Sequence, residues 1–289
     1  MNQTSTEQQK RLRKPDWLKV PIPSGKDYVG VKKIVHENKL HTICESGNCP
    51  NQAECWTAGT ATLMILGNVC TRSCQFCNVA TGKPEAVDIA EPYRVAQSIK
   101  TMGLKHVVLT SVDRDDLIDG GSKIWAATIR AIRKHAPGVT IETLIPDFQG
   151  KEDQLNRIIE VKPEIVSHNI ETVKRLTREV RVQARYERSM EVLAYLKKGG
   201  IDKTKSGLML GMGETEEEIY ETFDDLRKAG VEILTIGQYL QPTKNHLAVQ
   251  KYLHPDEFKK YKEVALEKGF TYVESGPLVR SSYHAEKHI

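Results

Sequence analysis

Residues 62–77 read TLMILGNVCTRSCQFC, and they join an apolar run to a loop that carries three cysteines. The run at 62–67 has the length and composition of a buried strand. In a parallel α/β sheet, the loops that follow the strands meet at the carboxyl edge, where such folds build their active sites. The stretch therefore predicts the first strand of a parallel sheet, with Cys70, Cys74 and Cys77 placed for chemistry at its end.

The same pattern of a strand followed by a helix repeats along the rest of the chain. Strands are expected at 62–67, 106–111, 140–145, 164–170, 205–210 and 232–237, and helices at 91–102, 122–135, 151–160, up to 198, 214–229 and 255–268. Such alternation implies parallel strands joined by right-handed crossovers, with the helices outside. Six units are fewer than the eight of a closed barrel. We therefore predict an α/β fold, a partial (β/α)6 TIM-like barrel.

Both ends of the chain lie outside this alternation of strands and helices. An amino-terminal extension at 1–59 holds three cysteines and few strand signals, and a tail at 276–289 ends the chain. We predict that both pack on the barrel at 60–275.

Composition excludes several classes of protein. The 289 residues are 39% hydrophobic with a formal charge of +4, which is ordinary for a protein with a large core and far from a nucleic-acid binder. No apolar run resembles a signal peptide or a membrane-spanning helix. We expect a cytoplasmic protein that binds neither nucleic acid nor membrane, with a processed organellar form as the second option.

All six cysteines lie between Cys44 and Cys77. Without a sign of export, disulfides are a weak interpretation, and a metal or redox site is a strong one. Three thiolates leave one position of a four-ligand site open, which suits an iron–sulfur cluster that anchors a small molecule. The alternative is a zinc ribbon, but its cysteines come as close pairs at long separation, which neither triad matches.

CTRSCQFC matches the C-x3-C-x2-C motif of radical S-adenosylmethionine enzymes, including the aromatic Phe76 before the last cysteine. The resemblance implies that Cys70, Cys74 and Cys77 hold a 4Fe-4S cluster whose open iron is chelated by S-adenosylmethionine. It also implies reductive cleavage to a 5′-deoxyadenosyl radical, which removes hydrogen from unactivated carbon.

The second triad, Cys44, Cys49 and Cys55, occurs in CESGNCPNQAECW, and the tail contains RSSYHA. Together they resemble the lipoyl synthase family. This resemblance implies an auxiliary 4Fe-4S cluster on the three cysteines, with Ser282 as its fourth ligand and its sulfides as the source of inserted sulfur. A serine oxygen is a harder ligand than thiolate and should leave iron more readily.

The resemblance extends from KPDWLK through TSVDRDDL, ETLIPDF, HNIET, KSGLMLGMGE and GQYLQPT to the tail. It implies insertion of two sulfur atoms at C6 and C8 of an octanoyl group on a carrier lysine. The implied partners are octanoylated lipoyl carrier domains, namely E2 subunits of 2-oxoacid dehydrogenases and the glycine cleavage H protein. A flavodoxin or ferredoxin electron donor and a cluster-assembly or carrier protein are also implied.

Further polar residues follow the expected strands and are candidates for contacts to S-adenosylmethionine: Thr110, Ser111, Asp113, Asn169, Glu171 and Gly211. For the first three the alternative is a capped, solvated loop. For Gly211 it is a strand-to-helix turn, with Glu214 near a helix amino terminus. Both interpretations of Gly211 can hold together.

Six basic residues between 174 and 188 are spaced to place positive charge one helical turn apart: Lys174, Arg175, Arg178, Arg181, Arg185 and Arg188. We hypothesise that part of this patch binds an acidic lipoyl domain or the carboxylate of S-adenosylmethionine, and the alternative is a solvated helix face. His168 and His246 are expected to make loop hydrogen bonds rather than bind metal. Two other functions stay open, namely a biotin synthase-like sulfur-inserting enzyme and a non-catalytic metal scaffold.

Overall fold

A computed structural model describes residues 12–20, 26–57 and 60–289. The expectation for 1–59 therefore lies partly outside the described residues. The main sheet has eight strands in the order β1-β2-β5-β6-β7-β8-β9-β10. Their bounds are β1 His41–Thr42, β2 Thr62–Ile65, β5 His106–Ser111, β6 Thr140–Leu144, β7 Ile165–Ser167, β8 Lys203–Leu210, β9 Ile233–Gln238 and β10 Tyr272–Gly276.

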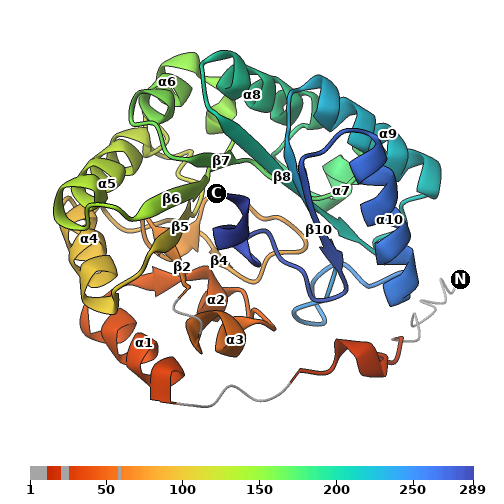
Figure 1. Ribbon diagram of the computed structural model, residues 1–289, viewed down its shortest axis with the longest axis horizontal. Helices are drawn as coiled ribbons and strands as arrows, with labels where there is room; N and C mark the ends of the chain where they lie inside the picture. The colour runs from red at the N-terminus through yellow and green to blue at the C-terminus, as the bar shows by residue number, and fades with distance from the viewer. Residues whose placement is uncertain (1–11, 21–25, 58–59) are drawn as a thin grey trace, which may run out of the picture.

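The outer layer consists of helices that follow the strands. They are α4 Glu91–Met102, α5 Ser122–His135, α6 Glu152–Glu160, α8 Tyr186–Lys198, α9 Glu216–Lys228 and α10 Pro255–Glu267. Figure 1 looks down the axis of the curved sheet and shows these helices around its outside. Parallel pairing runs from β2 through β10. The predicted partial (β/α)6 barrel is confirmed.

Several strands differ from the expectations, among them β1, which was not expected and pairs antiparallel with β2. Strand β7 is shorter than expected, and β8 begins at Lys203 rather than Lys205. Strand β10, which we had not expected, pairs in parallel with β9, with Tyr272 opposite Ile233. Its sequence YVESG has no apolar run because the strand is paired on one side only and is largely half-buried, so periodicity gave no signal.

Amphipathic helices build the core between the sheet and the outer layer. In α5, Trp125, Ile129 and Ile132 are buried at i, i+4 and i+7, which places them on one face against the sheet. The core has two large hydrophobic clusters, one around β2, β5 and β6 and one around β8, β9 and α10. Rigid packing of this kind fixes the positions of the loops at the carboxyl edge.

The interior of the barrel contains a buried ion pair near the amino ends of its strands. Lys205 Nζ lies 2.8 Å from Glu142 Oε1, and both side chains are almost fully buried. The last turn of the chain, η4 Ala285–His288, closes this end, with Lys203 Nζ donating to His288 O at 2.7 Å. The carboxyl terminus therefore lies inside the ring of strands (Figure 1).

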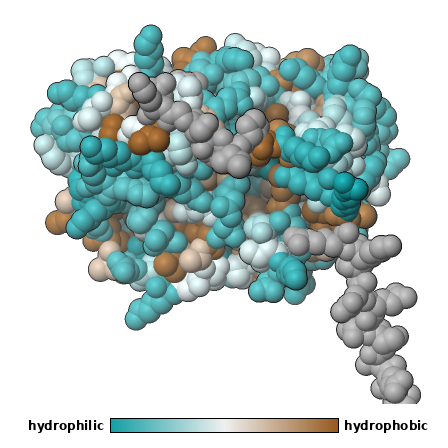
Figure 2. Space-filling model, turned by 90° about the horizontal axis from the view of Figure 1, so that it is seen from below, coloured by the Kyte–Doolittle hydropathy of each residue, from teal (hydrophilic) through white to brown (hydrophobic). Residues whose placement is uncertain are grey.

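The gap between the edge strands β1 and β10 is filled by elements from the two chain ends. These are α1 Lys26–Glu37, α2 Ile43–Ser46, α3 Gln52–Thr57 and the tail. Figure 2 views this side, where hydrophobic side chains lie in small groups among hydrophilic ones. Within the described part of the chain, no helix has the length and apolar character needed to cross a membrane.

Candidate active site

The first cysteine triad lies in the loop between the short strands β3 Val69–Cys70 and β4 Ala80–Thr81. The sulfur of Cys70 accepts hydrogen bonds from the backbone N–H groups of Arg72 and Asp113 at 3.4 and 3.3 Å. Gln75 N donates to Val180 O at 2.9 Å, which ties the loop to the end of α7, Thr177–Val180. All three thiols line a cavity of about 490 Å³ at the carboxyl edge of the sheet.

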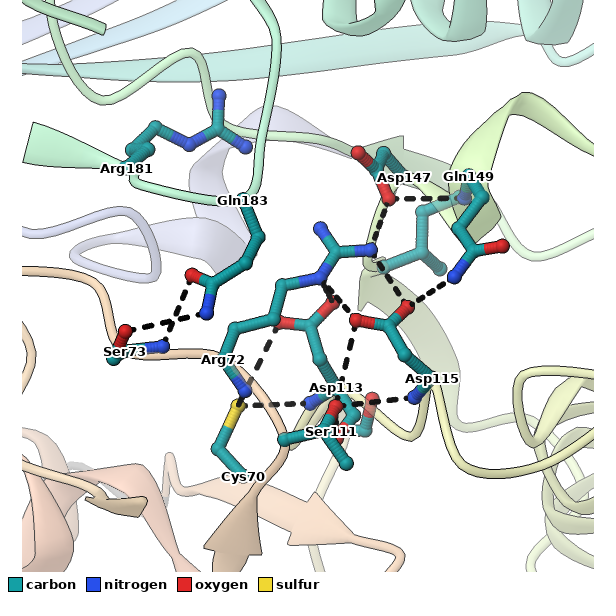
Figure 3. A network of polar contacts seen from close by, with 12 residues as sticks. Cys70, Arg72, Ser73, Ser111, Asp113, Asp115, Asp147, Gln149, Arg181 and Gln183 are labelled. Atoms are coloured by element: carbon teal, nitrogen blue, oxygen red, sulfur yellow. Dashed lines mark hydrogen bonds and ion pairs between the residues drawn. The ribbon is translucent and has the colours of Figure 1, made fainter. Parts of the chain in front are cut away.

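Arg72 holds this loop against its neighbours (Figure 3). The guanidinium is only 5% exposed, and it lies 2.7 Å from both Asp115 Oδ2 and Asp147 Oδ1 and 3.3 Å from Asp113 Oδ1. Burial alone would raise the pKa of Asp147, but the hydrogen bond and charge of Arg72 outweigh burial and hold it below its usual range. Loops after β2, β5 and β6 are thereby joined by one side chain.

Asp113 is a half-buried carboxyl beside the triad. Burial raises its pKa to about 6 despite the nearby Arg72. Its Oδ2 lies 3.8 Å from Cys70 Sγ. A carboxylate here faces the cavity, where it is available to an ammonium group.

Most of the sequence-predicted contact residues line the same cavity, namely Phe76, Thr110, Ser111, Asp113, Asn169 and Glu171. Five of them already have partners: Thr110 donates to Leu144 O, Ser111 accepts from Trp125, Asn169 donates to Glu171, and Asp113 pairs with Arg72. Asn169 Oδ1, in contrast, is buried without a partner among the described residues. A buried acceptor of this kind favours a ligand donor in the cavity.

Gly211 is not among the residues that line the cavity. It follows β8 with φ +103°, and its N–H donates to Glu214. A side chain there would collide with Gln238 and with the carbonyl of Lys251. These contacts agree with the alternative interpretation, in which Gly211 belongs to a strand-to-helix turn.

The second triad lies on the extension that fills the barrel gap. Cys44 is in α2, Cys49 precedes α3, and Cys55 is in α3. Burial raises the pKa of Cys44 to about 11 and that of Cys55 to about 12. The intervening Gly47 and Asn48 border the 490 Å³ cavity, so this triad lies beside the first site.

The tail brings Ser282 to this second triad from the opposite end of the chain. Asn51 Nδ2 donates to Leu278 O at 2.7 Å, and Thr62 donates to Ser282 Oγ at 2.8 Å. Tyr283 donates to Glu54 at 3.0 Å. Gly237 permits this path, because a side chain there would collide with the carbonyl of Val279.

The donor chemistry fits two clusters better than two single ions. All six thiols are free. Among the described residues, no three His, Cys, Asp or Glu side chains converge tightly enough to hold a metal ion. Thiolates on one zinc ion lie about 3.8 Å apart, since each bond is ~2.3 Å in a tetrahedron. A cluster of four irons spans a wider set of thiolates, and soft sulfur ligands select it.

Sequence reasoning missed two arginines at this site. Arg72 lies inside the quoted cysteine motif, and the acidic residues of TSVDRDD and IPDF were the signal for its partners. Arg280 lies in the tail motif, and its side chain lines the cavity near Cys49 and Glu171. Burial lowers its pKa. Within the described residues its only hydrogen bond is to the carbonyl of Val279, which leaves most of its donors for a ligand.

The basic patch at 174–188 does not form one surface. Arg181 is 6% exposed, donates to Ile170 O and Ser189, and lines the cavity. Arg175 pairs with Glu218, and Arg188 lies 3.5 Å from Asp147. The interpretation of Arg181 as part of a docking surface is therefore wrong, because this segment folds back into the barrel.

Arg178 and Arg185 are exposed, and neither forms an ion pair within the described ranges. Gln183 contacts Ser73 of the cysteine loop (Figure 3), and Val180 at the end of α7 accepts from Gln75 of the same loop, so the segment that carries these two arginines borders the site. The two histidines make loop hydrogen bonds as expected: His168 contacts Ile145 O and Ser189, and His246 contacts Cys77 O.

Two solved structures share the fold of this chain. SuiB from Streptococcus suis, bound to its precursor peptide SuiA, aligns with a TM-score of 0.60 at 12% identity, over 90% of this chain and 55% of that one. The maturase HydG from Carboxydothermus hydrogenoformans aligns with a TM-score of 0.56 at 15% identity, over 90% and 77%. At these identities the likeness shows the fold alone.

The model of the radical SAM superfamily matches residues 64–226. The model of the N-terminal domain of lipoyl synthase matches residues 1–49. The mitochondrial lipoyl synthase of Nematostella vectensis is 64% identical over 96% of both chains, and the lipoyl synthase of Flavobacterium johnsoniae is 63% identical over 96% of both.

Fold, cysteine loop and superfamily match define this chain as a radical S-adenosylmethionine protein, an enzyme class that uses 4Fe-4S chemistry. Within that superfamily, the chain belongs to the lipoyl synthase family. The family's cofactors are 4Fe-4S clusters, with S-adenosylmethionine as co-substrate.

Proposed function

We propose that this chain inserts two sulfur atoms, at C6 and C8, into an octanoyl group attached to a lysine of a carrier protein, which yields the lipoyl cofactor. The observation that carries the proposal is a cavity lined by the first cysteine triad and bordered by Gly47 and Asn48 of the second triad's segment, with the tail serine bonded to Thr62 at the start of β2. The 63% identity to a lipoyl synthase over nearly the whole chain supports it.

Cys70, Cys74 and Cys77 would hold the cluster that meets S-adenosylmethionine, and Cys44, Cys49, Cys55 and Ser282 would hold the sulfur-donating cluster. When bound, the first cluster supplies the electron that splits the sulfonium and releases the hydrogen-abstracting radical. The second cluster is a substrate of the reaction, because its sulfides enter the product.

The chain's own residues position and shield these partners. Asp113 and Glu171 offer carboxylates for the amino group or ribose of S-adenosylmethionine, and Arg181 offers a guanidinium for its carboxylate. Asn169 Oδ1 is a free acceptor in the same wall. The apolar Phe76, Met209 and Leu240 line the cavity and suit an octanoyl chain.

The proposed partners are octanoylated E2 subunits and the glycine cleavage H protein, a flavodoxin or ferredoxin as electron donor, and a protein that rebuilds the second cluster. These partners follow from family membership. The division into parts at 1–59, 60–275 and 276–289 and the cytoplasmic location stay predictions of the sequence.

Mass spectrometry of an octanoyl-lysine peptide tests the function. The peptide is incubated anaerobically with reconstituted protein, S-adenosylmethionine and a strong reductant. A gain of two sulfurs is expected, with no net loss of hydrogen in the reduced dithiol product and a loss of two hydrogens once that product is oxidised in air to the cyclic disulfide. An unchanged peptide alongside accumulating 5′-deoxyadenosine would keep the radical chemistry but reject this substrate.

A further inference from the structure

Thr62 is the first residue of β2, and it lies where the barrel, the extension and the tail meet. Its side chain is 3% exposed. Strand β2 pairs with β5 on one side, with Thr62 opposite Val108, and with β1 on the other. The position of Thr62 is therefore set by the sheet and not by the two chain ends.

Two residues from distant parts of the chain contact Thr62. Its hydroxyl donates to Ser282 Oγ at 2.8 Å across 220 residues of sequence. Its backbone N–H and hydroxyl also lie close to the sulfur of Cys44. Cys44 and Ser282 thus share one neighbour that belongs to the rigid sheet.

We propose that Thr62 is a positioning residue that holds Ser282 and Cys44 side by side and stabilises Ser282 as the ligand of the auxiliary cluster. This inference rests on the proposed function, since it takes Ser282 as a cluster ligand. The strand is fixed by the sheet, and the extension and the tail are both positioned against it.

The physical reason lies in the charge of the serine oxygen. A serine that binds iron loses its proton, and a hydrogen bond to an anionic oxygen is about twice as strong as one to a neutral oxygen. The Thr62 hydroxyl keeps its own proton in both states, so it favours the iron-bound form of Ser282 over the free form. A serine ligand held in this way stays on iron until turnover removes it.

The test uses Thr62→Val, which keeps the shape of the side chain and removes the hydroxyl. The background carries Cys70→Ala, Cys74→Ala and Cys77→Ala, so that only the auxiliary cluster assembles. After anaerobic reconstitution with labelled iron, loss of iron to a chelator is followed without any turnover. We expect Thr62→Val to lose iron about tenfold faster or more, which corresponds to one charge-assisted hydrogen bond.

Four comparisons separate positioning from a general loss of structure. Thr62→Ser should restore the parent rate, because serine keeps the hydroxyl. Ser282→Ala should lose iron at least as fast as Thr62→Val, and the double variant should be no faster than Ser282→Ala, since both remove the same interaction. Thr143→Val is the matched control, a buried strand threonine whose hydroxyl bonds only to Ile165 O within the described part of the chain.

Mössbauer spectra of the same samples give a second readout, the fraction of iron with an oxygen ligand, which Thr62→Val should lower. A parent-like rate and spectrum for Thr62→Val, or additive effects of Thr62→Val and Ser282→Ala, would overturn the inference while leaving the proposed function in place. If no cluster assembles in the background at all, both the inference and the two-cluster proposal fail.

Discussion

Cys44 is buried and the other five cysteines of the two triads are half-buried. Burial raises the pKa of Cys70 to about 11 and that of Cys74 to about 12. In the cluster-free chain these thiols are therefore protonated at neutral pH, and each one releases a proton when it binds iron. The neutral thiol is a poor nucleophile, so the empty site resists oxidation and alkylation.

His106 makes a measurable contribution to pH dependence at the other end of the barrel. Burial, followed by the charge of Lys205, lowers its pKa from 6.5 to about 4. Between these two pH values the unfolded chain binds the proton that the folded chain excludes, so stability falls as pH drops through this window. For the cluster-free protein we expect a loss of roughly 2 to 3 kcal/mol from this residue.

Urea denaturation from pH 7 to pH 4, with thiols kept reduced, measures the slope of the free energy of unfolding against pH. His106→Gln should reduce it, whereas His135→Gln on the outer helix should leave it as in the parent. A slope that is the same in His106→Gln would contradict the assignment.

At the scale of elements, the side chain of Arg72 holds together three loops that are far apart in sequence. Asp147 is fully buried and depends on Arg72 for its main ion pair. Arg72→Met leaves the acidic groups without their cation, and removing one partner of a buried pair costs about 3 to 5 kcal/mol. We expect a lower free energy of unfolding in the cluster-free protein by about that amount.

Chemical denaturation measures this difference. Lys33→Met is the control, because its ion pair with Glu37 within α1 is exposed and such pairs are worth under about 1 kcal/mol. Equal destabilisation by the two variants would show that the Arg72 network has no special role.

The roles of the two cysteine-bearing elements should also be distinguishable by which reaction product is lost when a cysteine of each is replaced. Cys74→Ala should abolish formation of 5′-deoxyadenosine, because its loop would hold the cluster that meets S-adenosylmethionine. Cys49→Ala should abolish sulfur insertion and leave some uncoupled cleavage, because it lies on the extension. Chromatography of both products from one reaction tests this, and equal loss of both activities would argue against separate roles.

At the scale of the whole molecule, Arg178 and Arg185 are exposed beside the cavity, where we expect a carrier domain to dock. Charge reversal of both, Arg178→Glu with Arg185→Glu, should weaken the binding of an acidic carrier domain about tenfold at low salt. The effect on binding should be smaller at high salt. The rate at saturating carrier should change little, because neither arginine lines the cavity.

Steady-state kinetics with an octanoylated carrier domain at two salt concentrations checks this prediction. Lys100→Glu with Lys134→Glu is the control, since both lysines are exposed in the last turns of α4 and α5 at the opposite face of the barrel. An unchanged KM in the arginine variant would remove the rim as a docking surface.

Sequence alone predicted the barrel because helix and strand periodicity repeat in six units, and apolar residues on one face of each helix fix its side of the sheet. It also predicted the cysteine motif, which is contiguous and needs no long-range contact. Periodicity did not reveal β10, because a polar edge strand carries no apolar run. Likewise, even helical spacing of six basic residues did not reveal that Arg181 is buried.

The sequence by itself determined the fold class, the two cysteine triads and the family, since these depend on local pattern and contiguous motifs. Only the tertiary structure decided which carboxylates Arg72 pairs with, and that Ser282 meets Thr62 across the barrel gap. Such contacts join residues that are tens to hundreds of positions apart. They depend on the path of the folded chain, which local pattern does not encode.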